Sequence, residues 1–139
     1  MVLGEKLWEG KGKTMGMAIK SAGPEGVTVE ATWMAQLKGV GRAKGVDGSV
    51  TFTGMVLMEP TGAGWSRGQG LFNMGGGDMA VVKGSGHGKV EDGKSKSVGL
   101  WGFMTMSQKL GWLNAVVALV TQEGDPMWQE FEMAVHEWK

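Results

Sequence analysis

Glycines at alternate positions are the feature of this chain that most constrains its fold. The chain has 26 glycines among 139 residues but only three prolines, and 42% of its residues are apolar, which argues against a disordered low-complexity chain. Many of the glycines are separated by a single residue: Gly10 and Gly12, Gly39 and Gly41, Gly68 and Gly70, and Gly84, Gly86 and Gly88. Such glycines share one face of a strand, and a face without side chains lets a sheet coil tightly. The pattern therefore predicts strongly curved β-structure.

Two segments of the chain nearly repeat each other. Residues 49–54 and 97–102 both begin with Ser-Val and end with Gly, and each segment follows an Asp-Gly pair, Asp47-Gly48 or Asp92-Gly93. Asp-Gly tolerates the positive φ angles that tight hairpin turns require. We therefore expect each segment to be the second arm of a hairpin whose first arm is rich in glycine.

Residues 27–38 give the clearest strand pattern. Apolar side chains occupy every second position there, which is typical of a strand with one buried face. Similar segments follow along the chain, separated by turn-rich stretches. We expect strands at residues 6–20, 27–38, 49–58, 67–74, 78–88, 97–106, 114–122 and 127–138, and one helical turn within 107–113. The sequence thus predicts one all-β domain spanning residues 1–139, a single antiparallel up-and-down β-barrel of about eight strands with at most one short helical turn.

Composition argues against several classes of partner. The chain has no cysteine, and its fourteen basic and fourteen acidic residues cancel, so there is no net field to attract nucleic acid. The first six residues include charges where a secretion signal needs an apolar run, and the longest later apolar run, residues 115–120, is too short to span a bilayer. We expect a soluble, cytoplasmic protein with neither a nucleic-acid nor a membrane partner.

The candidate motifs for catalysis or cofactor binding lack residues that these motifs require. Residues 84–89 resemble a phosphate-binding loop, but Lys83 and Val90 stand where that motif needs glycine and a hydroxyl residue. The two histidines, His87 and His136, have no cysteine to share a metal with, and we expect neither to be catalytic or metal-bearing. Three glutamates, Glu30, Glu130 and Glu132, fall on the strand faces predicted to be exposed. We expect no cofactor and no metal.

The order of these features resembles a group of small bacterial calycin-like barrels, which are related to the allene oxide cyclase and avidin-like barrels. The features that carry the resemblance are the glycine arms before each Ser-Val strand, Leu113-Asn114 entering a strand, and the closing residues 135–139. The resemblance implies a barrel that is often dimeric. The cyclases of this fold act on an oxidised fatty-acid derivative bound inside the barrel. The cyclase's working residues have no match here, and a shared barrel does not transfer a reaction.

The barrel interior is the remaining candidate site. Eight-stranded barrels either fill this space with side chains or hold one small ligand. The residues that we expect to contact a ligand are Trp33, Phe52, Met58, Leu100, Met104, Gln129, Phe131 and Met133. Gln129 is either a polar orienting group in that cavity or a residue at the barrel mouth, and we favour the mouth.

Two aromatic side chains fall on the face opposite to that predicted interior. Trp101 and Phe103 alternate with Leu100 and Met104, so this strand is apolar on both faces. An exposed apolar set is typical of a subunit interface, and a homodimer is therefore a further hypothesis. The functional hypothesis is a barrel that binds a small apolar molecule. The alternatives are a cyclase or isomerase acting on an oxidised lipid, and a structural module with a filled core.

Overall fold

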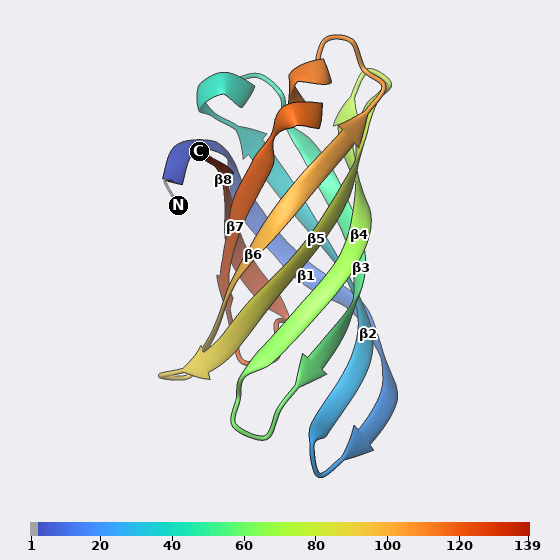
Figure 1. Cartoon of the computed structure of the whole chain (residues 1–139), viewed down its shortest axis with the longest axis vertical. Helices are drawn as coiled ribbons and strands as arrows, with labels where there is room; N and C mark the ends of the chain where they lie inside the picture. Colours follow the sequence, from blue (N-terminus) through green and yellow to red (C-terminus); the bar gives the residue numbers. More distant parts are fainter. Residues whose placement is uncertain (1–2) are drawn as a thin grey trace.

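The structure is a computed structural model that describes residues 3–139, and it shows a closed antiparallel β-barrel (Figure 1). The eight strands are β1 (Leu3–Gly23), β2 (Gly26–Gly39), β3 (Gly48–Met58), β4 (Gly64–Gly75), β5 (Asp78–Glu91), β6 (Lys94–Thr105), β7 (Val117–Gly124) and β8 (Glu130–Trp138). Each strand pairs with the next, and β8 pairs with β1 to close the ring. The predicted all-β barrel of eight antiparallel strands is confirmed.

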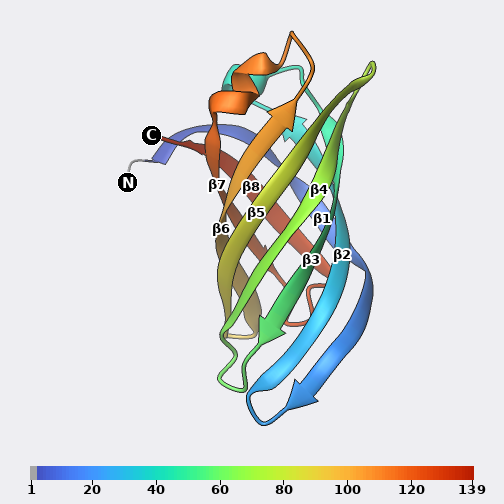
Figure 2. The same cartoon turned by 45° about the vertical axis from the view of Figure 1, so that its right-hand side comes forward.

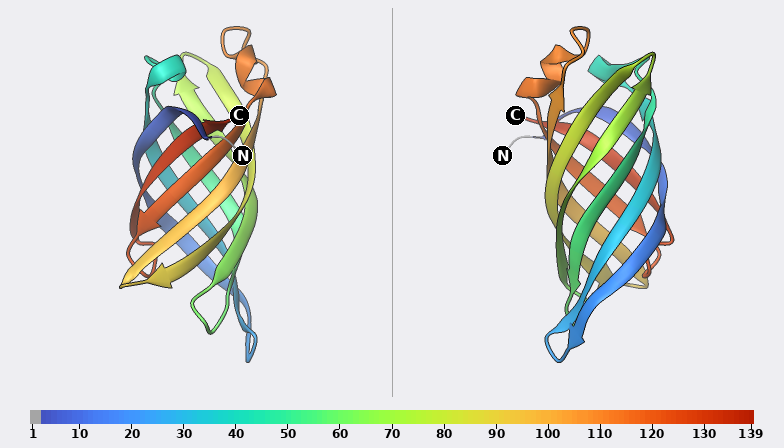
Figure 3. Two further views of the ribbon diagram at one scale, coloured as in Figure 1. Left: turned by 60° about the vertical axis from the view of Figure 1, so that its left-hand side comes forward. Right: turned by 90° about the vertical axis from the view of Figure 1, so that its right-hand side faces the viewer.

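Two short 3-10 helices lie at the upper end of the barrel in Figure 1. They are η1 (Gly41–Ala43), between β2 and β3, and η2 (Gly111–Ala115), between β6 and β7. The start of β1 and the C-terminal end of β8 lie toward this end (Figure 3). The β1–β2 hairpin extends beyond the other strands at the lower end (Figure 2). No helix among residues 3–139 is long and apolar enough to cross a bilayer.

The two expected tight hairpins have different outcomes. The β5–β6 turn is tight, with Asp92 at φ 54° and Gly93 at φ 75°, as a two-residue hairpin turn with two positive φ angles requires. β2 and β3 also pair antiparallel, but η1 lies in their connection and Gly48 already belongs to β3. The expected tight turn at Asp47-Gly48 is therefore wrong. Asp47 instead accepts a hydrogen bond from the backbone N–H of Gly39 at 2.9 Å and so ties together the ends of a wider loop.

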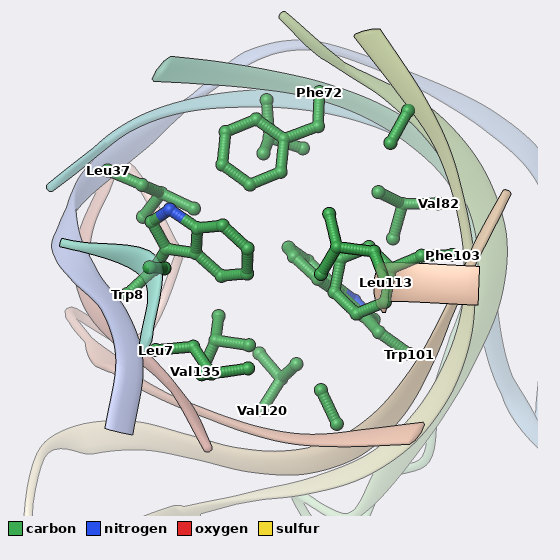
Figure 4. Packing of buried hydrophobic residues seen from close by; sticks show 14 of the residues in the cluster. Leu7, Trp8, Leu37, Phe72, Val82, Trp101, Phe103, Leu113, Val120 and Val135 are labelled. Atoms are coloured by element: carbon green, nitrogen blue, oxygen red, sulfur yellow. The ribbon is translucent and has the colours of Figure 1, made fainter. Parts of the chain in front are cut away.

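The upper half of the barrel is filled by side chains (Figure 4). Trp8 and Phe72 meet edge to face with their ring centroids 5.0 Å apart, and Leu113 of η2 is fully buried. The indole N–H of Trp8 donates to the carbonyl of Val46 at 2.8 Å, which satisfies its one buried polar group. This end of the interior is thus a packed core, closed by the two 3-10 helices.

Glycines on neighbouring strands make room for the large aromatic rings. Gly84 lies opposite Trp101 and Gly12 lies opposite Phe131 in the ladders. A Cβ atom added to Gly84 would lie 2.5 Å from Cδ1 of Trp101, and one added to Gly12 would lie 2.6 Å from Cζ of Phe131. Each ring therefore occupies the volume that a neighbouring side chain would need.

The ring-over-glycine packing can be tested with a matched pair of substitutions on β5 and β6. Gly84→Ala is expected to lower the free energy of unfolding by about 1 to 3 kcal/mol, because the new methyl group forces the Trp101 ring to shift. Gly102→Ala is the control, because its Cβ would meet no atom within 4 Å, and its effect is expected to stay within about 0.5 kcal/mol. Urea unfolding measures both values, and equal losses would contradict this account of the packing.

Candidate functional site

Four aromatic residues meet in the interior and form what we call the aromatic cluster: Trp33, Phe52, Trp101 and Phe131. The rings of Trp33, Phe52 and Trp101 are within 16° of parallel, with centroids 5.1 to 6.2 Å apart. The Phe131 ring meets Trp33 edge to face at 5.4 Å. Phe52, Trp101 and Phe131 are buried, whereas Trp33 is only partly buried. Trp33 is thus the one member of the cluster that is not fully buried.

The barrel wall along β4, β5 and β6 is nearly bare backbone at the level of the cluster and below it. Its inward positions are Gly64, Ser66, Gly68 and Gly70 on β4, Gly84, Gly86 and Gly88 on β5, and Ser95, Ser97 and Gly99 on β6. A Cβ on Gly68 would lie 2.3 Å from the carbonyl oxygen of Thr53 on the next strand, so the sheet coils too tightly there for larger residues. This confirms the predicted role of the alternating glycines on β4 and β5.

The barrel wall is incomplete on one side of its lower end. β1 pairs with β8 only as far as Lys13, opposite Glu130, and the remainder of β1 pairs only with β2. The β7–β8 turn lies where that ladder ends. Thr14 holds the turn in place, since its hydroxyl donates to the carbonyl of Trp128 at 2.6 Å.

Trp128 adopts an unusual backbone conformation in this turn. Its φ angle is +56°, a left-handed value that bulky residues rarely adopt. Its ring meets Phe131 edge to face at 5.9 Å, so the strained residue covers one side of the aromatic cluster.

Asp125 organises the backbone around Trp128. Its carboxylate accepts hydrogen bonds from the backbone N–H groups of Glu130 at 2.8 Å, Met127 at 2.9 Å and Gln129 at 3.1 Å. These bonds favour the charged form, so they lower the pKa of Asp125, the one from Glu130 contributing most. The turn is therefore held by an ionised carboxylate.

Several predicted ligand residues have the expected positions. The side chains that face the interior are Trp33, Phe52, Phe131 and Met133. The Trp33 ring contacts both the Phe52 ring and the Phe131 ring. Gln129 is exposed in the β7–β8 turn, in agreement with a place at the barrel mouth. Met58 is exposed at the lower end of β3, outside the cluster.

The expected orientation of β6 is wrong by one residue. Leu100 and Met104 point outward, with exposed fractions of 39% and 61%, whereas Trp101 is 5% exposed and faces the interior with Phe103. A strand that is apolar on both faces gives no alternation from which to choose the inner face. The choice follows from pairing, because Trp101 lies opposite Gly84 and its ring needs the space that this glycine leaves. The sequence analysis therefore missed Trp101 as a cluster residue, and it did not place Trp128 beside Phe131.

Two hollows of about 630 and 590 Å³ are lined by β1, β7 and β8, together with β6 in the first and β2 in the second. They share Lys11, Glu123 and Glu132 in their linings, and these side chains are exposed. Among residues 3–139, no group of three or more histidine, aspartate or glutamate side chains is arranged to hold a metal ion. His87 is exposed on β5, and His136 is partly buried on β8. Both hollows are open to solvent, but their linings also include inward-facing residues, Ser97 and Met133 in one and Phe131 of the aromatic cluster in the other.

The sequence matches no known protein family and no curated protein. Solved structures with a similar fold include a protein of unknown function from Clostridium acetobutylicum, with a TM-score of 0.81 and 12% identity over the whole of both chains. A conserved protein of unknown function from Rhodopseudomonas palustris has a TM-score of 0.77 and 13% identity, covering 99% of this chain and 98% of its own. A β-barrel-like protein from Acinetobacter baumannii has a TM-score of 0.79 and 15% identity, covering 99% and 96%. These likenesses show the barrel fold alone.

The carboxylate of Asp125 gives the β7–β8 turn a predictable pH dependence. Because the folded pKa lies below the unfolded value of about 3.9, its stabilising effect is fully present above that value. The effect is lost as the pH falls through the folded pKa. Asp125→Asn should therefore be less stable than the parent protein at neutral pH, and the difference should shrink in acid. Unfolding free energies measured across this range, with Glu132→Gln as control, test this, and a difference independent of pH would contradict it.

Proposed function

We propose that this barrel binds one small, flat apolar molecule at the lower end of its interior, against the aromatic cluster. The observation that carries the proposal is that Trp33 faces the interior but is only partly buried, while Phe52, Trp101 and Phe131 beside it are buried. An inward-facing aromatic surface that remains uncovered favours an apolar partner, since stacking adds to the gain from removing its area from water.

The surroundings of Trp33 support a small and flat ligand. The upper core is filled with side chains, so it leaves no room above the cluster. The glycines on β4 and β5 that no ring covers, Gly64, Gly86 and Gly88, let a ligand approach the backbone of the wall closely. Access is from the lower end, where β1 has no second neighbour beyond Lys13.

The polar groups nearby support binding rather than turnover. The Thr14 hydroxyl is bonded to the Trp128 carbonyl, and Ser97 and Gln122 are hydrogen-bonded to each other at 3.1 Å. These groups already have partners and are not arranged as an acid and a base on either side of a reacting atom. The cyclase or isomerase that the fold resemblance implies is therefore the weaker alternative. The packed upper core favours the third hypothesis, a structural module. The following experiment distinguishes a structural module from a ligand-binding barrel.

Binding of a neutral naphthylamine probe tests the proposal. Trp33→Leu is expected to weaken probe binding about tenfold, because it removes stacking worth about 1.5 kcal/mol. Met104→Ser, which removes an exposed apolar side chain from the outer surface, is the control and should leave affinity unchanged. Native mass spectrometry of freshly purified protein would in addition detect a ligand that co-purifies.

A structural module gives a different result in the same assay. If Trp33 serves only the core, then Trp33→Leu lowers the free energy of unfolding while the parent protein binds no probe. Absence of probe binding by the parent protein, or equal loss in Trp33→Leu and Met104→Ser, would refute an interior ligand site.

A further inference from the structure

The outer surface of β4, β5 and β6 carries large apolar side chains that nothing in the chain covers. We call this surface the apolar–basic face; its strands lie toward the viewer in Figure 1. Its large apolar residues have exposed fractions between 39% and 61%: Trp65, Leu71, Met79, Val98, Leu100 and Met104. Isolated exposed apolar residues are ordinary, but a connected set of this kind marks a contact surface.

The strand register shows that these side chains are neighbours. Leu71 is paired with Val81, which is paired with Met104, so the three form a row across β4, β5 and β6. A second row runs from Trp65 through His87 to Val98. Residues directly opposite each other in a ladder share a face and lie within contact of one another. The face is thus continuous across three strands.

Charges on this face are almost all positive. Arg67 and Lys83 point outward between the apolar rows. The carboxylate on the outer positions of these three strands is Glu91, at the β5–β6 hairpin, where it pairs with Lys89 at 3.0 Å and Lys96 at 3.7 Å. The outer positions of the other strands instead carry both signs of charge: Glu9, Glu30, Glu123, Glu130 and Glu132 lie there with Lys11, Lys13 and Lys38. The apolar–basic face therefore has an excess of positive charge, although the net charge of the chain is zero.

We propose that the apolar–basic face lies against an anionic lipid bilayer. Exposed apolar side chains enter the interfacial region of a bilayer, and Arg67 and Lys83 bind the lipid phosphates from the ends of their long stems. Trp65 suits the same boundary, because tryptophan is enriched at membrane–water interfaces. The sequence-based expectation of no membrane partner depended on the lack of an apolar run long enough to span a bilayer, which has no bearing on peripheral binding.

Charge and shape both favour a bilayer over other occupants. A second copy using the same face would bring its own Arg67 and Lys83 against an equally basic surface, where the carboxylate of Glu91 is already paired with Lys89 and Lys96. β4, β5 and β6 are hydrogen-bonded on both sides, so no free edge is available for an added strand. The two surface hollows include no residue of β4 or β5. A fluid anionic surface can conform to a convex face without a groove, and this proposal does not depend on a ligand inside the barrel.

Co-sedimentation of the protein with vesicles tests the proposal. Vesicles of mixed phosphatidylglycerol and phosphatidylcholine should bind the protein, with an affinity that falls as salt is added, and vesicles of phosphatidylcholine alone should bind it far more weakly. A cation near an anionic surface contributes about fivefold to affinity, so the double variant R67Q/K83Q should bind about 25-fold more weakly. The apolar variant L71S/M104S should also lose binding.

The matched control is the double variant K13Q/K38Q, which removes two exposed cations from β1 and β2. It changes net charge as much as R67Q/K83Q does and should leave vesicle binding unchanged. Equal loss in both double variants would overturn the proposal, because binding would then follow net charge and not this face. It would also be overturned if the parent protein did not sediment with anionic vesicles. A lipid-free dimer that L71S/M104S converts to monomer would overturn it in favour of a second copy.

Discussion

The packing of aromatic rings over glycines on neighbouring strands is the interaction on which the rest of this structure depends. Trp101 occupies the space beside Gly84, and Phe131 occupies the space beside Gly12. The same glycines permit the coil that closes eight strands into a narrow ring. The curvature of the sheet and the filling of the core therefore depend on the same glycines, because a side chain at these positions would both flatten the sheet and displace a ring. The partly uncovered Trp33 lies at the edge of this arrangement.

Much of the fold could be predicted because it follows from local patterns. Alternation over residues 27–38 and the positive φ angles of Asp92 and Gly93 are properties of short segments, and both predictions are confirmed. The tight turn at Asp47-Gly48 failed because Asp47 bonds to Gly39, eight residues away, and a wider loop results. An Asp-Gly pair allows a tight turn but does not require one.

The candidate site was predictable only in part, for a related reason. Trp33, Phe52 and Phe131 belong to strands with one clearly apolar face or a clear polar opposite face. In β6 both faces are apolar, so the inner face depends on which residue lies opposite Gly84. The distribution of charge was unpredictable for the same reason: composition gives a balanced total, but the excess of cations on the outer face of β4, β5 and β6 depends on strand register.

The pairing of β1 with β8 has a consequence for how the chain folds. These strands are the first and last in sequence, so the ladder that closes the ring joins residues more than a hundred positions apart. During synthesis the ring cannot close until β8 has emerged, and until then β1 and β7 each present an unpaired edge. Closure across such a long loop is slow compared with formation of the local hairpins. Before β8 is available the chain is thus an open sheet with exposed apolar surface, and chaperone contact is most useful to it in that interval.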